Sequence, residues 1–131
     1  MSAEAASLDC GEILYRAVLR KSQLDITKRP PRPTADNFMC RPEQDDDGLS
    51  VGIASRLSPA EFAARFTKCH AIVSIHTGHL RDLGLRIIVD PEDDTHALIQ
   101  GLPDREARKN DAETIARSIL GSVRPVDMSG D

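Results

Sequence analysis

The segment "LRIIVDPEDDTHALIQGL" (residues 85–102) decides the fold class of this chain. Two apolar runs, residues 85–90 and 96–102, stand on either side of "PEDDT", which is polar and acidic. A polar connection of this length between two apolar runs of strand length predicts a β-hairpin with a solvated turn. We therefore expect an antiparallel sheet that contains this hairpin.

Three other segments are expected to add strands to the sheet. "EILYRAVLR" (residues 12–20) alternates a more apolar with a less apolar face, and residues 49–53 and 71–75 are short apolar runs. Both patterns are typical of strands. "FMCR" (residues 38–41) is a further, shorter candidate.

Capping signals and apolar spacing predict the helices. Ser58 suits an N-cap, Pro59 the first helical position and Glu61 the second half of a capping box. Residues 76–84 predict a single helical turn, and residues 111–120 repeat apolar side chains at helical spacing. The whole pattern predicts an α+β fold, in which a mostly antiparallel sheet of about five strands is covered by two or three short helices.

Length and composition indicate one globular domain. The chain has 131 residues, and we expect residues 12–121 to form a single α+β domain with flexible ends at 1–11 and 122–131. The first residues lack the apolar core of a signal peptide, and no apolar run approaches the ~18 residues of a transmembrane helix. The three cysteines form no CxxC pair. We expect a cytoplasmic protein that does not associate with membranes.

Charge and aromatic content argue against a general nucleic-acid binder. The formal net charge is −4, and aromatic residues make up 3% of the chain. Proteins that bind nucleic acids without sequence preference need a basic surface, and those that bind single strands add aromatic platforms on which bases stack. We therefore do not expect general nucleic-acid binding.

His96 is the first candidate for a functional side chain. It opens an apolar run directly after the acidic residues Asp90, Asp93 and Asp94. One interpretation is a general acid or base, or a contact to an oxyanion. The other is a structural histidine that closes the hairpin by bonding Asp94 or Thr95.

A pair of histidines elsewhere in the chain forms an incomplete metal-binding pattern. His76 and His79 form an HxxH pair, whose imidazoles share a face if the turn is helical. Few residues separate the strand at 71–75 from the strand at 85–90, so the two are expected to be antiparallel neighbours. That arrangement puts the pair at the opposite end of the sheet from His96, and we expect no bound metal ion.

Arg16 is a candidate because it lies within an apolar strand. An arginine in such a place must reach solvent or find a partner. A structural salt bridge to an acidic residue would satisfy it, and so would a bidentate contact to a phosphate or carboxylate of a ligand. Both interpretations are open.

Three blocks of sequence carry a resemblance. "LYRAV", "DDDGLSV" and "HTGHLRDLGLRIIVDPEDDTHALIQGL" follow one another within residues 12–102, and in them the chain resembles a group of small bacterial proteins of unassigned function. The strand with "YR" followed by a serine-containing strand is also similar to ADP-ribosyltransferase-like folds. That similarity implies nucleotide contacts from Arg16 and Ser50, although neither Glu92 nor Glu106 matches the catalytic glutamate of those folds.

Two functions of different classes are expected. The first is a small bacterial interaction or regulatory module without a cofactor, which acts through a protein partner. Residues 21–37 hold three prolines and must be mostly loop, and a loop of this length suits ordering by a partner. The alternative is an enzyme for a nucleotide or phosphate-bearing substrate. Its catalytic candidates are Arg16 and His96, and Arg16, Ser50 and His96 would bind the ligand.

Overall fold

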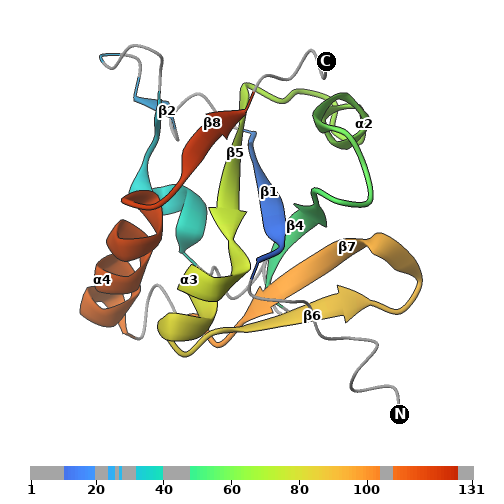
Figure 1. The fold of residues 1–131 in the computed structure, drawn as a ribbon. Helices are drawn as coiled ribbons and strands as arrows, with labels where there is room; N and C mark the ends of the chain where they lie inside the picture. Colours follow the sequence, from blue (N-terminus) through green and yellow to red (C-terminus); the bar gives the residue numbers. More distant parts are fainter. Residues whose placement is uncertain are drawn as a thin grey trace.

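The computed structural model describes residues 11–19, 24–25, 27, 32–39, 48–103 and 108–126. Its centre is a six-stranded sheet in the order β6-β7-β4-β1-β5-β8, in which every neighbouring pair is antiparallel (Figure 1). The strands are β1 (Ile13–Val18), β4 (Leu49–Ile53), β5 (Ala71–His76), β6 (Arg86–Asp90), β7 (Asp93–Gln100) and β8 (Arg124–Val126). A separate ribbon pairs β2 (Leu24–Asp25) with β3 (Arg32–Pro33). The predicted α+β fold class is confirmed.

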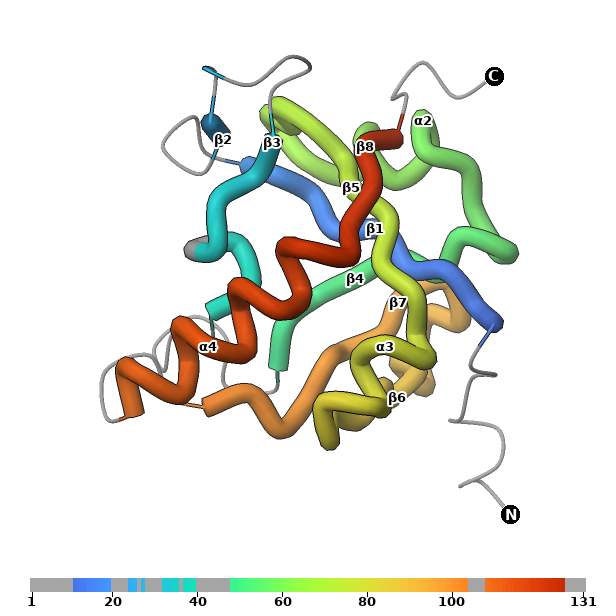
Figure 2. Tube along the Cα trace, turned by 60° about the vertical axis from the view of Figure 1, so that its left-hand side comes forward, coloured from blue at the N-terminus to red at the C-terminus, as the bar shows by residue number. Residues whose placement is uncertain are grey.

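Helices cover both faces of the sheet. Within the described residues they are α2 (Pro59–Ala63), α3 (Thr77–Asp82), α4 (Lys109–Leu120) and the 3-10 helix η2 (Ala35–Phe38). Buried residues of α3, α4 and η2 pack on one face, which we call the core face, and α2 packs on the other, the α2 face (Figure 2). None of the helices in this described part is long and apolar enough to cross a membrane.

Alternation along β4 decides which side chains enter the main core. Leu49, Val51 and Ile53 are fully buried and belong to the cluster on the core face. Because successive side chains of a strand point to opposite faces, Ser50 points to the α2 face. On β7 the same alternation buries Ala97 and Ile99 in the core cluster.

The capping box predicted at the start of α2 is confirmed. Ser58 Oγ accepts a hydrogen bond from the N–H of Glu61 at 3.1 Å, and Glu61 Oε1 accepts one from the N–H of Ser58 at 2.7 Å. Phe62 then holds the helix to the sheet. Its ring centroid lies 5.9 Å from that of Tyr15 and 5.2 Å from that of Phe66.

The hairpin predicted over residues 85–102 is confirmed, but its turn is shorter than expected. β7 begins at Asp93, and Asp90 pairs with Asp93. The acidic residues of the connection bond within it: Asp93 Oδ1 accepts from the N–H and the hydroxyl of Thr95, at 3.0 and 2.6 Å. The β-branched Thr95 favours extended backbone, so the polar residues lengthen the strand.

Three expectations about connections are wrong within the described residues. Phe38 does not start a strand, because it ends η2 and is fully buried. Residues 124–126, expected within a flexible end, form β8, which pairs with β5. A short edge strand that contains a proline lacks the alternation of apolar and polar residues by which a strand is predicted. β5 and β6 are neither neighbours nor antiparallel, since three strands lie between them and the two run in the same direction. His76 therefore lies toward the same end of the sheet as His96, and the expectation of opposite ends is wrong. The short connection between β5 and β6 runs over the core face through α3, which contacts both strands.

Some expectations concern residues outside the described part of the chain. Of the loop expected at residues 21–37, residues 21–23, 26 and 28–31 lie outside it. The others form β2, β3 and most of η2, except Thr27 and Thr34, which belong to no helix or strand. Residues 1–10 and 127–131 also lie outside it.

Candidate active site

Three adjacent strands bring a serine, a histidine and an aspartate together on the α2 face. Ser50 comes from β4, His96 from β7 and Asp90 from β6, and these strands are neighbours in the order β4-β7-β6. In the ladder His96 faces Gly52 and Ser50 faces Leu98. Ser50 is therefore the diagonal neighbour of His96, within reach on the same face.

The three side chains form one hydrogen-bonded series. Ser50 Oγ bonds to Nε2 of His96, and His96 Nδ1 lies 3.0 Å from Oδ2 of Asp90. An ionised carboxylate can only accept, so the proton of the neutral imidazole belongs on Nδ1. Nε2 is then free to accept the hydroxyl proton of Ser50. This is the connectivity of a Ser-His-Asp triad.

Asp90 is held as a carboxylate. Its Oδ1 accepts from the N–H of Glu92 at 2.8 Å, and this bond, followed by the bond to His96, lowers the pKa of Asp90 below its ordinary value. Hydrogen bonds to the charged form favour that form. At neutral pH the side chain is therefore ionised, as the orienting acid of a triad must be.

Solvent can reach the serine from the α2 face. Ser50 is exposed, whereas the side chains of His96 and Asp90 are 24% and 30% exposed. Leu98 faces Ser50 in the ladder between β4 and β7, and it faces Ile88 in the ladder between β7 and β6. The side chains of Leu98 and Ile88 are half-buried. The hydroxyl thus lies at the end of a small apolar strip formed by Leu98 of β7 and Ile88 of β6.

The register of the hairpin aims Asp90 at His96. Val89 pairs with Ala97, but the next pair is Asp90 with Asp93, so the ladder is irregular between Val89 and Asp90. Bulges of this kind re-aim side chains and are frequent beside functional sites. A strand of the same composition with a regular ladder would place the carboxylate differently.

Two arginines tie the hairpin turn to the segment around α2. Arg65 donates to Asp93 Oδ2 at 3.1 Å and to Thr95 Oγ1 at 2.6 Å, and Arg56 donates to the carbonyl of Asp94 at 2.8 Å. The carboxylate of Asp93 and the backbone carbonyl of Asp94 are thus bonded to arginines, and of the acidic residues before His96 it is Asp90 that bonds the imidazole. The structural bond from His96 to Asp94 or Thr95, which the sequence left open, is not the arrangement found.

Gly52 leaves room for α2 beside the site. A Cβ at this position would lie 2.7 Å from Cδ1 of Phe62, so the helix packs directly on the backbone of β4. Gly52 faces His96 across the ladder. The packing of α2 and the position of the imidazole therefore depend on the same short piece of β4.

Arg16 lies on the other face of the sheet from the serine hydroxyl. Leu14, two residues earlier on β1, belongs to the core-face cluster, so Arg16 points to the core face. Its guanidinium donates to the carbonyls of Asn37 and Ser50, at 3.1 and 2.9 Å. Arg16 thus supports the backbone that carries the serine, and the structure does not bring it together with His96.

The HxxH histidines are also separate from this site. His79 Nε2 donates to the carbonyl of Ser118 on α4 at 3.1 Å, and His76 is the exposed last residue of β5. Within residues that the structure describes, no three His, Cys, Asp or Glu side chains converge in a way that could hold a metal ion.

Each member of the triad was visible in the sequence, but their association was not. Ser50 and His96 are expected ligand-binding residues, and Asp90 is an expected neighbour of His96. What sequence reasoning missed is that β4 and β7 are adjacent, which alone puts the serine beside the imidazole. The "DDTHALIQ" strand and the "LSVGI" strand carry no local signal for that pairing.

Comparison with known proteins found no matching family model, no matching curated protein and no matching solved structure. The resemblance to small bacterial proteins and to ADP-ribosyltransferase-like folds stays a prediction.

Proposed function

We propose that this protein is a serine-dependent hydrolase of carboxylic esters, with Ser50 as the nucleophile. The observation that carries the proposal is the unbroken series of hydrogen bonds from Ser50 through both nitrogens of His96 to Asp90. A serine hydroxyl is a weak nucleophile unless an adjacent base takes its proton. Nε2 of His96 is that base, and Asp90 holds the imidazole in the required tautomer and stabilises its charged form.

The reaction has two halves. Ser50 Oγ attacks the carbonyl carbon of the ester while its proton passes to His96 Nε2. The carbon–oxygen bond to the alcohol breaks, and the alcohol leaves with that proton. Water then attacks the acyl-serine, His96 accepts a proton from the water, and Ser50 Oγ recovers a proton as the carboxylic acid is released.

The surroundings of Ser50 favour a short aliphatic acyl group. Leu98 and Ile88 offer apolar surface beside the hydroxyl, and both are half-buried. Apolar contact of this kind contributes roughly 25 cal/mol per Å² of surface removed from water. Because the serine is exposed, an ester on a larger carrier could also reach it.

This proposal takes up the enzymatic alternative raised by the sequence, with a different set of residues. Ser50 and Asp90 replace Arg16 as the partners of His96, and the substrate is an ester in place of a nucleotide. A function through a protein partner that binds at residues 21–37 stays a prediction.

A fluorophosphonate probe and p-nitrophenyl butyrate test the proposal together. We expect the probe to label Ser50, as located by mass spectrometry of peptides, and Ser50→Ala to abolish both labelling and ester hydrolysis. His96→Ala should slow both by roughly 10²–10⁴, the usual contribution of a general base. Ser55→Ala is the matched control, because Ser55 is also exposed but its hydroxyl bonds to Glu12, at 2.9 Å.

Labelling of Ser50 that is independent of His96 would refute the proposal. So would ester hydrolysis that survives Ser50→Ala in a protein of unchanged circular dichroism.

A further inference from the structure

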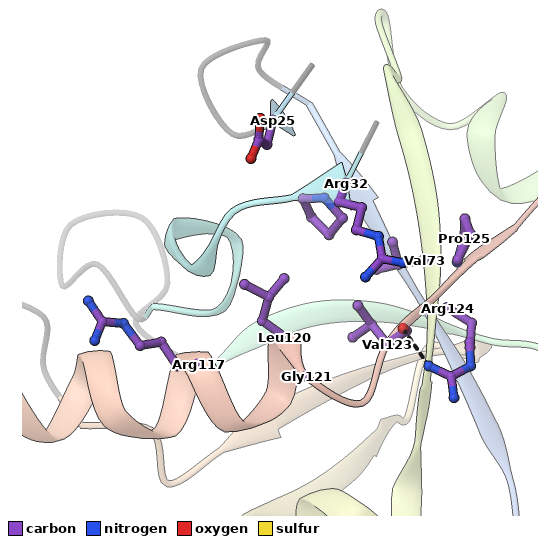
Figure 3. A pocket seen from close by; sticks show the side chains of 10 residues that line it. Asp25, Arg32, Val73, Arg117, Leu120, Gly121, Val123, Arg124 and Pro125 are labelled. Atoms are coloured by element: carbon purple, nitrogen blue, oxygen red, sulfur yellow. Dashed lines mark hydrogen bonds between the residues drawn. The ribbon is translucent and has the colours of Figure 1, made fainter. Parts of the chain in front are cut away.

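A cavity lies on the core face, away from the triad. It has a volume of about 340 Å³ and sits between the β2–β3 ribbon and the C-terminal end of α4 (Figure 3). Val73 of β5 and Pro125 of β8 are paired in the sheet at one side of it. Pro33, Leu120 and Val123 complete an apolar lining. The volume is within the range of small-molecule sites, about 300–1,000 Å³.

Arg32 brings a positive charge over this apolar lining. It is an exposed residue of β3, and its side chain reaches across the cavity toward Val73 (Figure 3). Within the described part of the chain, the guanidinium of Arg32 makes no hydrogen bond or ion pair that would occupy its donors. A guanidinium presents five N–H donors in a planar fork that matches a carboxylate or a phosphate.

The other charged residues of the cavity are directed elsewhere. Arg117 leans away along α4 and lies 3.5 Å from Glu113 (Figure 3). Arg124 faces Ser74 in the ladder, so its side chain belongs to the α2 face, opposite to Pro125. The carboxylate of Asp25 accepts from the N–H of Thr27 at 3.0 Å. Arg32 is therefore the guanidinium that is aimed into the space.

We propose that this cavity binds a small amphipathic anion, with its aliphatic part on the apolar lining and its carboxylate or phosphate on Arg32. An apolar site with one convergent charged group is the usual composition of a small-molecule pocket. The apolar lining removes the chain of the ligand from water, and the guanidinium fixes the anionic head by charge-assisted hydrogen bonds. This site does not depend on the hydrolase proposal, because its residues lie on the other face of the sheet from Ser50.

Hexanoate, hexyl phosphate and uncharged hexanol test the inference. Binding is followed by amide chemical shifts in the full chain, and we expect saturable shifts at Val73, Leu120 and Val123. At least one of the two anions should bind roughly tenfold or more tightly than hexanol, since a hydrogen bond to a charged group contributes about 1.5–3 kcal/mol. The tighter of the two identifies the preferred head group.

Variants of the arginines separate the anion contact from general charge. Arg32→Ala should abolish the preference of the anions over hexanol, and Arg32→Lys should restore part of it. Arg86→Ala removes the same charge from β6, at the opposite edge of the sheet from β8, and should leave the affinities unchanged. Equal affinities of all three probes, or shifts that gather around Leu98 and not around Leu120, would overturn the inference without touching the hydrolase proposal.

Discussion

Replacing Gly52 by alanine should destabilise the protein through a clash with α2. A Cβ at this position would lie 2.7 Å from Cδ1 and 2.9 Å from Cε1 of Phe62. Carbon atoms in favourable contact are about 3.5–4.0 Å apart, so the methyl group is roughly 1 Å too close. The ring has little space to move, because it is 3% exposed and stands between Tyr15 and Phe66.

The size of the effect follows from two opposing contributions. Overpacking of a filled core typically costs about 1–3 kcal/mol. Replacing glycine by alanine restricts the unfolded chain, which returns about 0.4–1 kcal/mol. We therefore expect Gly52→Ala to lower the free energy of unfolding by about 1–2 kcal/mol, with a fall of several degrees in melting temperature.

Urea unfolding of a double-mutant cycle isolates the contact. Phe62→Leu removes the ring, so Gly52→Ala in that background should cost at least about 1 kcal/mol less than in the natural chain. Gly121→Ala is the matched control. The nearest atoms to a Cβ at Gly121 are 3.6 Å away and its φ is −67°, so we expect unchanged or slightly higher stability there.

Additive losses in the cycle would refute this reasoning. Gly52→Ala as stable as the natural chain would refute it as well, because the ring would then have room that the packing of Phe62 does not allow.

Three further predictions concern stability and reactivity. Ser58→Ala should cost about 1 kcal/mol, because it removes the cap of α2, and an unchanged melting midpoint would show that the capping box contributes nothing. Hydrogen bonds lower the pKa values of two carboxyl groups: the N–H of Glu92 bonds Asp90, and Thr95 bonds Asp93. Each carboxylate therefore stabilises the folded state fully above its unfolded pKa of ~4. This stabilisation is lost as the pH falls through the lower pKa of the folded state. Urea midpoints should therefore decrease below about pH 5, and Asp90→Asn should flatten that decrease; a variant with the same pH profile would contradict the assignment. Burial raises the pKa of the Cys69 thiol, so iodoacetamide should modify Cys69 more slowly at neutral pH than it modifies free cysteine, as measured by peptide mass.

Local sequence patterns predicted most of the helices and strands, but they did not predict which distant strands pair. The capping box at Ser58 and the hairpin around Asp90 are short-range features, written within a few residues of sequence. β8 was not predicted, because a three-residue strand that contains Pro125 shows no apolar periodicity. The triad was not predicted, because Ser50 and His96 come together only through the pairing of β4 with β7, and no local pattern encodes that pairing.

The order of the strands has a consequence for how the chain folds. β1 is the earliest strand of the sheet in the sequence, yet it lies between β4 and β5, so Leu14 must find Ile53 and Ile13 must find His76. Closing such long loops costs entropy before any contact compensates, which gives a high contact order and folding in milliseconds to seconds. The β6–β7 hairpin is local and should form in about 1–10 μs. His96 and Asp90 would then be associated early, and Ser50 would join them only when β4 docks on β7 late in folding.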